Sequence, residues 1–146
     1  MIVHAGLIAR RVGGFWKGVL IEGASGAGKS DLALRLLDQG FRLVADDRVL
    51  VWASGGRLYG RAPDPLKGLI EARGIDVLPM PTVDFTEIFL SVHCVPLGAD
   101  VERIQGEACE TLAGLEIPML RLRALEPSAP AKLAHAMRVL AREARR

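Results

Sequence analysis

The chain has 146 residues, a length that favours one compact domain with a sizeable core. Half of the residues are hydrophobic and a quarter are charged, which excludes an intrinsically disordered or collagen-like protein. The formal net charge of +2 is too small to indicate nucleic acid or an anionic membrane as the main partner. We therefore expect a globular domain that folds unaided.

The chain shows neither a disulfide framework nor a membrane segment. Cys94 and Cys109 form no CxxC pair, and the first residues lack the basic region and long apolar run of a signal peptide. The longest apolar candidate, from Ile88 to Ala99, contains His93 and Pro96 and falls short of the about 20 apolar residues that a membrane-spanning helix needs. The sequence predicts a protein of the reducing cytoplasm that does not cross a bilayer.

The chain opens with β-type runs and then changes to helical spacing. Ile2–Ala9 and Gly18–Glu22, separated by the turn-forming Gly13–Gly14, predict a hairpin or two neighbouring strands. Ser30–Gln39 carries one apolar helical stripe, and Gly40 stands where a helix C-terminus favours glycine. These patterns predict a strand, a glycine-rich loop and a helix in that order.

The middle of the chain is rich in strand patterns. Phe41–Ala45 predicts a strand, and Val49–Ala53 with Arg57–Arg61 predicts a β-hairpin. Leu66–Gly74 fits either a short helix or a loop.

The last third predicts two strands and a helix. Glu87–Val95 and Leu115–Leu122 have the composition of strands. Ser128 and Pro130 are typical of a helix start, and apolar residues from Leu133 onward repeat at helical spacing. We expect an α/β protein that ends in an amphipathic helix.

A phosphate-binding motif lies between the second predicted strand and the first predicted helix. The segment matches GxxxxGK[ST] at every fixed position, in the strand-loop-helix context that the motif requires. Its glycines let backbone N–H groups point at phosphate oxygens, the lysine reaches the β and γ phosphates, and the hydroxyl can ligate magnesium. A fortuitous glycine turn is the alternative. The predicted nucleotide-binding residues are Gly23, Ala24, Ser25, Gly26, Ala27, Gly28, Lys29 and Ser30.

Two adjacent aspartates follow the strand after the predicted helix. Asp46 and Asp47 are expected at the sheet edge that also carries the phosphate-binding loop. One carboxylate could hold magnesium and the other could accept a proton from an attacking hydroxyl, as a phosphotransferase requires. The alternative is an ordinary turn, in which aspartate is common.

His93 and Cys94 are the other pair with possible metal-ligand chemistry. Because adjacent residues of a strand point to opposite faces, we interpret the pair as structural.

The arrangement of these motifs resembles the catalytic domain of the HPr kinase/phosphorylase family over almost the whole chain. The resemblance rests on GASGAGKS at Gly23–Ser30, GFRLVADD at Gly40–Asp47, LIEARGI at Leu69–Ile75 and VERI at Val101–Ile104. It implies a single α/β catalytic domain over residues 1–146. The implied fold is a phosphate-loop kinase core similar to phosphoenolpyruvate carboxykinase, with a mixed β-sheet and a C-terminal helix.

The resemblance also implies roles for individual residues. Asp47 matches the group that accepts the proton of the target serine, and Lys29 matches the lysine that stabilises the transferred phosphoryl group. Arg103 matches an arginine at the reacting phosphates, and His4 matches a histidine that precedes the phosphate-binding loop.

Ser30 and Glu71 match the magnesium positions of the family, and Asp46 is a supporting carboxylate. Hard carboxylate and hydroxyl oxygens suit magnesium, so the resemblance and the physical chemistry agree.

The chain departs from the family pattern in two places. We expect no separate N-terminal domain like that of the long members, because the sequence resembles the short, catalytic-domain-only forms. It also has no match to the basic RPGRN-like loop, because Ile117–Arg123 leads instead to Glu126, Pro127 and Ser128.

The resemblance implies ATP- and magnesium-dependent phosphorylation of a serine on a small HPr-type phosphocarrier protein of the phosphotransferase system. It also implies the reverse, phosphate-dependent dephosphorylation, a role in signalling, and a homo-oligomer, which in this family is a hexamer. Two alternatives remain open: a small-molecule kinase and a non-catalytic nucleotide-binding regulator.

Overall fold

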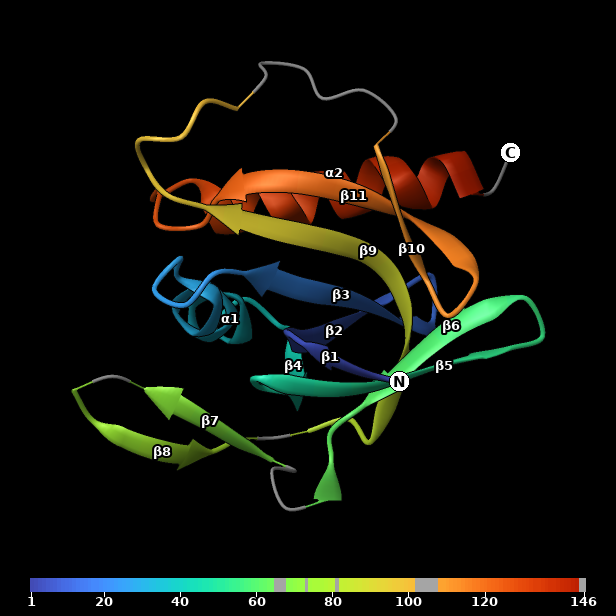
Figure 1. Ribbon diagram of the computed structural model, residues 1–146, viewed down its shortest axis with the longest axis horizontal. Helices are drawn as coiled ribbons and strands as arrows, with labels where there is room; N and C mark the ends of the chain where they lie inside the picture. Colours follow the sequence, from blue (N-terminus) through green and yellow to red (C-terminus); the bar gives the residue numbers. More distant parts are fainter. Residues whose placement is uncertain (65–67, 73, 81, 102–107, 145–146) are drawn as a thin grey trace.

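The computed structural model describes residues 1–64, 68–72, 74–80, 82–101 and 108–144. One large curled sheet forms the centre of this part of the chain, two helices cover one of its faces, and a separate two-stranded hairpin lies below it (Figure 1). The strands of the large sheet are β1 (Ile2–His4), β2 (Gly6–Val12), β3 (Phe15–Gly23), β4 (Arg42–Ala45), β5 (Arg48–Ser54), β6 (Arg57–Arg61), β9 (Phe85–Val95), β10 (Cys109–Leu112) and β11 (Leu115–Arg123). The small hairpin is β7 (Leu69–Ala72) with β8 (Asp76–Pro79), and the helices are α1 (Lys29–Leu37) and α2 (Ala129–Ala144).

The strand directions bring several carboxyl ends to one edge of the large sheet. β2 pairs antiparallel with both β3 and β4, so β3 and β4 point the same way. β9 runs parallel to β3, and β11 runs parallel to β9. The arrowheads of β3, β9 and β11 accordingly lie on the same side in Figure 1. The sheet is therefore mixed, yet β3 and β4 end at a common edge.

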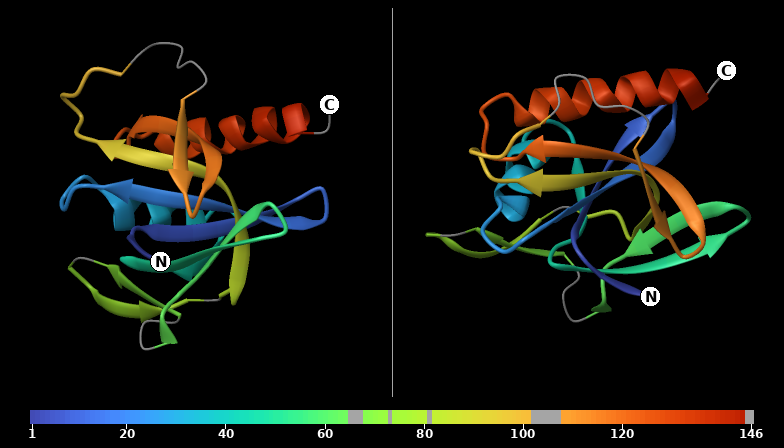
Figure 2. Two further views of the ribbon diagram at one scale, coloured as in Figure 1. Left: turned by 45° about the vertical axis from the view of Figure 1, so that its right-hand side comes forward. Right: turned by 45° about the horizontal axis from the view of Figure 1, so that its top comes forward.

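Two apolar cores lie on the two faces of the sheet. On one face, α1 and α2 bury Leu36 and Leu133 against Ile21 and Val92. Figure 2 shows α2 lying along this face. On the other face, Leu20 packs in a second cluster together with residues of β5, β6 and the β10–β11 hairpin. Alternate side chains of β3 therefore enter different cores, as expected for a strand that is covered on both faces.

The expected α/β class, mixed sheet and C-terminal helix are confirmed, but one segment was predicted incorrectly. Leu66–Gly74 was expected to form a helix or a loop, whereas Leu69–Ala72 forms β7 and pairs with β8. Ile70 is fully buried in the same core as α1. Tertiary pairing therefore decides the conformation of a segment whose local pattern is ambiguous. The short strands β8 and β10 were not predicted.

The α2 core position provides a test of this packing. Leu133 is completely buried, whereas Val139 on the same helix is 53% exposed. We expect Leu133→Ala to lower the free energy of unfolding by about 2–5 kcal/mol, because the substitution leaves a cavity. Val139→Ala should lower the free energy of unfolding by less than about 0.5 kcal/mol, because the Val139 side chain is largely exposed to solvent. Urea unfolding of the two variants tests this, and equal losses would contradict the packing of α2.

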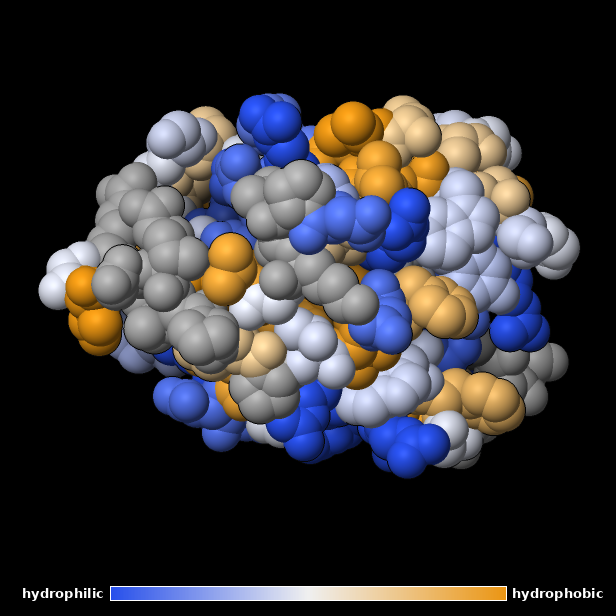
Figure 3. Space-filling view, turned by 90° about the horizontal axis from the view of Figure 1, so that it is seen from below, coloured by the Kyte–Doolittle hydropathy of each residue, from blue (hydrophilic) through white to orange (hydrophobic). Residues whose placement is uncertain are grey.

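The described surface is mixed in character. Hydrophilic and hydrophobic residues are interspersed over the face seen in Figure 3. Neither α1 nor α2, the helices of the described residues, has the length and apolar character needed to cross a bilayer.

Candidate functional site

The phosphate-binding loop connects the end of β3 to the start of α1. Gly23, Gly26 and Gly28 adopt positive φ angles of 149°, 83° and 92°. These angles are unfavourable for residues with a Cβ atom, which explains why the loop places glycine at these positions. Its tip from Ala24 to Gly26 is exposed. The loop therefore presents backbone groups to solvent at the N-terminus of α1, an arrangement that binds phosphate.

Two of these glycines also lie too close to neighbouring atoms for a side chain. A Cβ atom on Gly23 would lie 2.8 Å from the carbonyl oxygen of Cys94, and one on Gly28 would lie 2.7 Å from Cδ2 of Leu125. Gly26 has no such neighbour within 4 Å. Close packing thus requires glycine at both ends of the loop, whereas a Cβ atom on Gly26 would meet no neighbouring atom.

This difference predicts unequal effects of alanine in the loop. Gly26→Ala should lower the free energy of unfolding by about 1–2 kcal/mol, the cost of a left-handed residue with a Cβ atom. Gly28→Ala should cost more, because the added methyl group must also displace the side chain of Leu125. Adding Leu125→Ala to Gly28→Ala should remove this excess. Urea unfolding of all three variants is the measurement, and an identical loss for Gly26→Ala and Gly28→Ala would contradict the loop packing.

Lys29 is held at the base of the loop. Its Nζ atom donates a hydrogen bond to the carbonyl oxygen of Gly23 at 2.6 Å, and the residue is half-buried. This contact closes the loop on itself between the end of β3 and the first residue of α1. The ammonium group is therefore positioned where a bound phosphate would meet the loop.

The next residue, Ser30, connects the loop to the aspartates that follow β4. Its hydroxyl donates a hydrogen bond to Oδ1 of Asp46 at 3.0 Å. This contact follows from the parallel directions of β3 and β4, which end at the same edge of the sheet. A hydroxyl and a carboxylate oxygen thus lie together beside the phosphate-binding loop.

Asp47 is exposed at the same edge, in a turn between β4 and β5. Its φ angle is 68°, and its backbone oxygen accepts a hydrogen bond from the N–H of Ala5 at 3.1 Å. Nδ1 of His4 lies 3.8 Å from Oδ1 of Asp47, and both side chains are largely exposed. Arg48 adds a longer contact of 4.0 Å from Nε to Oδ2. The carboxylate is therefore accessible to a solvent-borne partner.

The remaining predicted residues are not placed in this constellation. Glu71 belongs to β7, and the preceding residue, Ile70, is buried in the core with α1. The side chain of Glu71 lies outside the described part of the structure. Arg103 lies outside the described residues altogether. Of the sequence-predicted site, the described residues unite the phosphate-binding loop, Asp46, Asp47 and His4 on one edge.

The donor atoms at this edge fit a nucleotide phosphate with magnesium. The loop offers backbone N–H groups and the Lys29 ammonium, which are donors for phosphate oxygens. Ser30 and Asp46 offer hard oxygen ligands 3.0 Å apart, the kind that Mg²⁺ prefers.

A second polar cluster was not found from the sequence. His93 indeed points away from Cys94, which is buried in the core beneath α1 and α2. Burial raises the pKa of the Cys94 thiol to about 11. On the opposite face, however, His93 meets Glu22 and Glu110. The signal for this cluster is Glu22 itself, a charged residue inside the apolar run of β3.

The family model of the HPr Serine kinase C-terminal domain matches residues 3–124. The chain belongs to this family. The match includes the phosphate-binding loop, both aspartates and the strands that position them.

Relatives and a solved structure agree with this assignment. The HPr kinase/phosphorylase of Limosilactobacillus reuteri (strain DSM 20016) is 45% identical over 93 residues, which are 58% of this chain and 29% of that protein. The HPr kinase/phosphorylase of Streptococcus pyogenes serotype M5 (strain Manfredo) is 34% identical over 116 residues, 72% of this chain and 37% of that protein. The chain thus spans about a third of the length of these curated relatives.

The structure of the Hpr(Ser) kinase/phosphatase from Coxiella burnetii is similar over nearly the whole fold. It has a TM-score of 0.78 and 25% sequence identity, with 99% of this chain and 96% of that chain covered.

Proposed function

We propose that this chain is an ATP- and Mg²⁺-dependent kinase that phosphorylates a serine of a small HPr-type phosphocarrier protein of the phosphotransferase system. The observation that carries this proposal is the hydrogen bond from Ser30 of the phosphate-binding loop to Asp46, the neighbour of Asp47 in the chain. The names of the relatives supply the class of substrate. In this proposal residues 1–146 act as a single catalytic domain in the cytoplasm and assemble as a homo-oligomer, a hexamer by family resemblance.

The loop from Gly23 to Ser30 binds the triphosphate in this mechanism. Its backbone N–H groups bind phosphate oxygens, and the Lys29 ammonium exchanges the Gly23 carbonyl for the β and γ phosphates. The exchange is favourable because a phosphate carries more negative charge than a carbonyl oxygen. Lys29 then stabilises the charge that spreads over the transferred phosphoryl group.

Ser30 and Glu71 would hold magnesium, and Asp46 would support them from the end of β4. The ion, when bound there, would neutralise part of the negative charge of the phosphates. The Ser30 hydroxyl turns from Asp46 to present its oxygen lone pair, and Asp46 then accepts hydrogen bonds from the surrounding water.

Asp47 orients the incoming serine and accepts its proton. The serine oxygen forms the new bond to the γ phosphorus, the bond between this phosphorus and the β–γ bridging oxygen breaks, and ADP leaves with that oxygen. The exposure of Asp47 suits a hydroxyl that arrives on another protein. His4 lies beside this carboxylate and Arg103 adds positive charge at the phosphates.

The reverse reaction uses the same groups. Inorganic phosphate attacks the phosphoserine, the serine oxygen leaves with the proton that Asp47 returns, and pyrophosphate forms. We propose this activity although the sequence has no match to the basic RPGRN-like loop of the family. At that position Glu126 contacts Arg123 at 3.1 Å and Lys132 at 2.8 Å. These two cations hold the pKa of Glu126 below its ordinary value.

The test is intact-mass analysis of an HPr-type protein incubated with this chain, MgCl₂ and ATP. We expect a mass increase of one phosphoryl group that requires Mg²⁺ and is absent with the Lys29→Ala variant. Excess inorganic phosphate should then remove the group and release pyrophosphate. If the chain binds ATP but no HPr-type protein gains mass, the proposal is wrong, and a small-molecule kinase or a silent regulator takes its place.

A further inference from the structure

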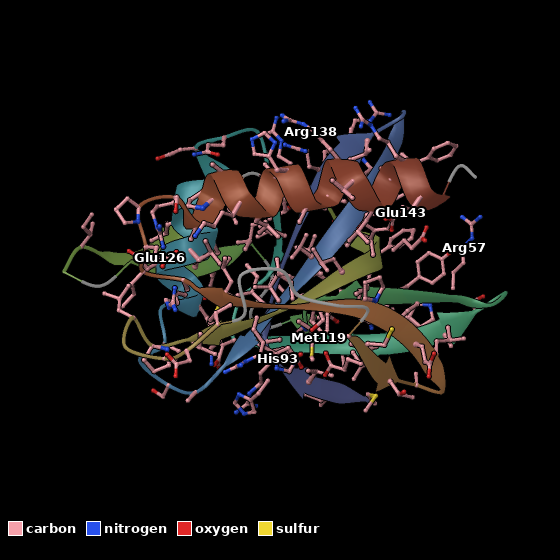
Figure 4. All side chains as sticks on the ribbon, turned by 90° about the horizontal axis from the view of Figure 1, so that it is seen from above. Arg57, His93, Met119, Glu126, Arg138 and Glu143 are labelled. Atoms are coloured by element: carbon pink, nitrogen blue, oxygen red, sulfur yellow. The ribbon has the colours of Figure 1, made fainter. Side chains whose placement is uncertain are left out.

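A compact polar cluster lies on the face of the sheet opposite α1 and α2. Glu22 of β3 and His93 of β9 are direct neighbours in the parallel register. Ser91 lies two residues before His93 on the same face, and Glu110 reaches the cluster from β10. Figure 4 shows His93 on the side of the sheet away from α2, beside Met119 of β11. Three separate strands thus bring these four side chains together.

The functional atoms are within contact distance of one another. Nε2 of His93 lies 2.8 Å from Oε2 of Glu22 and 3.1 Å from Oε2 of Glu110. The hydroxyl oxygen of Ser91 lies 2.8 Å and 2.5 Å from the same two carboxylate oxygens. The two carboxylates are thus held close to each other by their shared contacts with Ser91 and His93.

The cluster brings two carboxylates together with few hydrogen-bond donors. An ionised carboxylate only accepts hydrogen bonds, and the Ser91 hydroxyl and the Nε2 atom of His93 carry at most one hydrogen each. Two ionised carboxylates in contact repel each other. A bound divalent cation would balance their negative charge.

We propose that Glu22, His93 and Glu110 form a binding site for a divalent transition-metal ion of the Zn²⁺ type. One imidazole nitrogen and two carboxylate oxygens are ligands that Zn²⁺ accepts, whereas Mg²⁺ is bound through oxygen ligands. The three ligand atoms lie within 4.8 Å of one another. Tetrahedral Zn²⁺ with bonds of about 2.0–2.2 Å places its ligands about 3.3–3.6 Å apart, so a small outward shift of each side chain accommodates the ion.

The surroundings have the properties of a built site rather than a surface cluster. Ser91 is fully buried and contacts both carboxylates, so it orients the ligands as an outer hydrogen-bond partner does. The side chains of Glu22 and Glu110 are 13% and 19% exposed, whereas His93 is 36% exposed. The exposed side leaves the fourth position to water.

A bound ion would connect the β10–β11 hairpin to the end of β3. Glu22 directly precedes Gly23, the first residue of the phosphate-binding loop, while Glu110 belongs to β10. In Figures 1 and 2 the β10 strand crosses the face on which the cluster lies. The ion would therefore stabilise the strand from which the loop starts. The proposed site uses neither of the residues proposed to hold magnesium, Ser30 and Glu71.

The experiment is equilibrium dialysis of the full chain, first stripped with EDTA, against micromolar ZnCl₂ in the presence of millimolar MgCl₂. We expect a single Zn²⁺ ion per chain by elemental analysis and a higher unfolding temperature with Zn²⁺ than with EDTA. The chain has three histidines, so each is replaced in turn. Only His93→Ala should lose the ion, whereas His4→Ala and His135→Ala should retain it.

Further variants separate ligands from neighbours. Glu22→Gln and Glu110→Gln keep the side-chain volume and should weaken binding more than the about 10- to 100-fold expected for an outer partner such as Ser91→Ala. Cys109→Ser should leave binding unchanged, which excludes capture by the exposed thiol. A wild-type chain that retains no Zn²⁺ overturns the proposal, whether or not the variants fold. Equal Zn²⁺ binding by wild type and a folded His93→Ala variant does so as well.

Discussion

Asp47→Asn is expected to lower the rate of phosphoryl transfer by about 10²–10⁴-fold, the range that a positioned general base contributes. The amide of asparagine cannot accept the serine proton, although it has nearly the same shape. Nucleotide affinity should change little, because Asp47 contacts His4, Arg48 and Ala5, none of which belongs to the phosphate-binding loop. Single-turnover transfer and nucleotide binding, measured on the same preparation, separate the two effects.

The substitution is suited to this purpose because the fold should tolerate it. Asp47 has a φ angle of 68°, and asparagine adopts this left-handed conformation more readily than most residues. Asp64→Asn is the matched control, because Asp64 is an exposed aspartate that pairs with Arg61, away from the proposed site. Transfer by Asp47→Asn at the wild-type rate would refute the assignment of the base.

Lys29→Ala is the second substitution with a large expected effect. The ammonium group lies against the Gly23 carbonyl at the base of the loop. Its loss should slow transfer by about 10²–10³-fold, the range seen when one group that stabilises developing charge is removed. The stability of the protein should change far less. The single hydrogen bond to the Gly23 carbonyl contributes only about 0.5–1.5 kcal/mol.

Lys132→Ala provides the control for loss of a lysine. Lys132 lies on α2, is 54% exposed and pairs with Glu126 at 2.8 Å. The Lys132→Ala variant should transfer the phosphoryl group at the wild-type rate. Transfer rates are compared at saturating ATP, and unfolding temperatures are measured alongside. An active Lys29→Ala variant, or one that fails to fold, would contradict the role of this lysine at the loop.

Much of the fold was predictable because its elements carry local signals. The leucine stripe of α1 and the β-type run of β3 determine these elements from nearby residues, and Gly40 follows the helix with a φ angle of 88° as expected for a helix end. β7 carries no such signal. Its conformation depends on pairing with β8 and on burial of Ile70 beneath α1, both of which are tertiary events.

The candidate site shows the same division. The spacing of the motif predicts the loop, and alternation of strand and helix predicts that Asp46 lies near it, where the structure has the hydrogen bond to Ser30. β3 and β4 both pair antiparallel with β2, so they point in the same direction. The prediction that Asp46 lies near the loop therefore did not require knowing that the sheet is mixed.

The Glu22–His93–Glu110 cluster was not predicted for a different reason. Its members come from three strands, and the β10 strand that carries Glu110 was itself missed. His93 was considered with its neighbour in sequence, Cys94, whereas its actual partners lie across the sheet. Long-range register is what brings such residues together, and a single sequence does not reveal it.

The measurement that tests the account most directly is localisation of the phosphoryl group on an HPr-type protein after reaction with this chain, Mg²⁺ and ATP. Fragmentation mass spectrometry should place the group on a serine, with formation lost for Asp47→Asn and Lys29→Ala and retained for Asp64→Asn and Lys132→Ala. A carrier that stays unmodified while the chain binds ATP, or modification that survives Lys29→Ala, would contradict the assignment of this sheet edge as a serine kinase site.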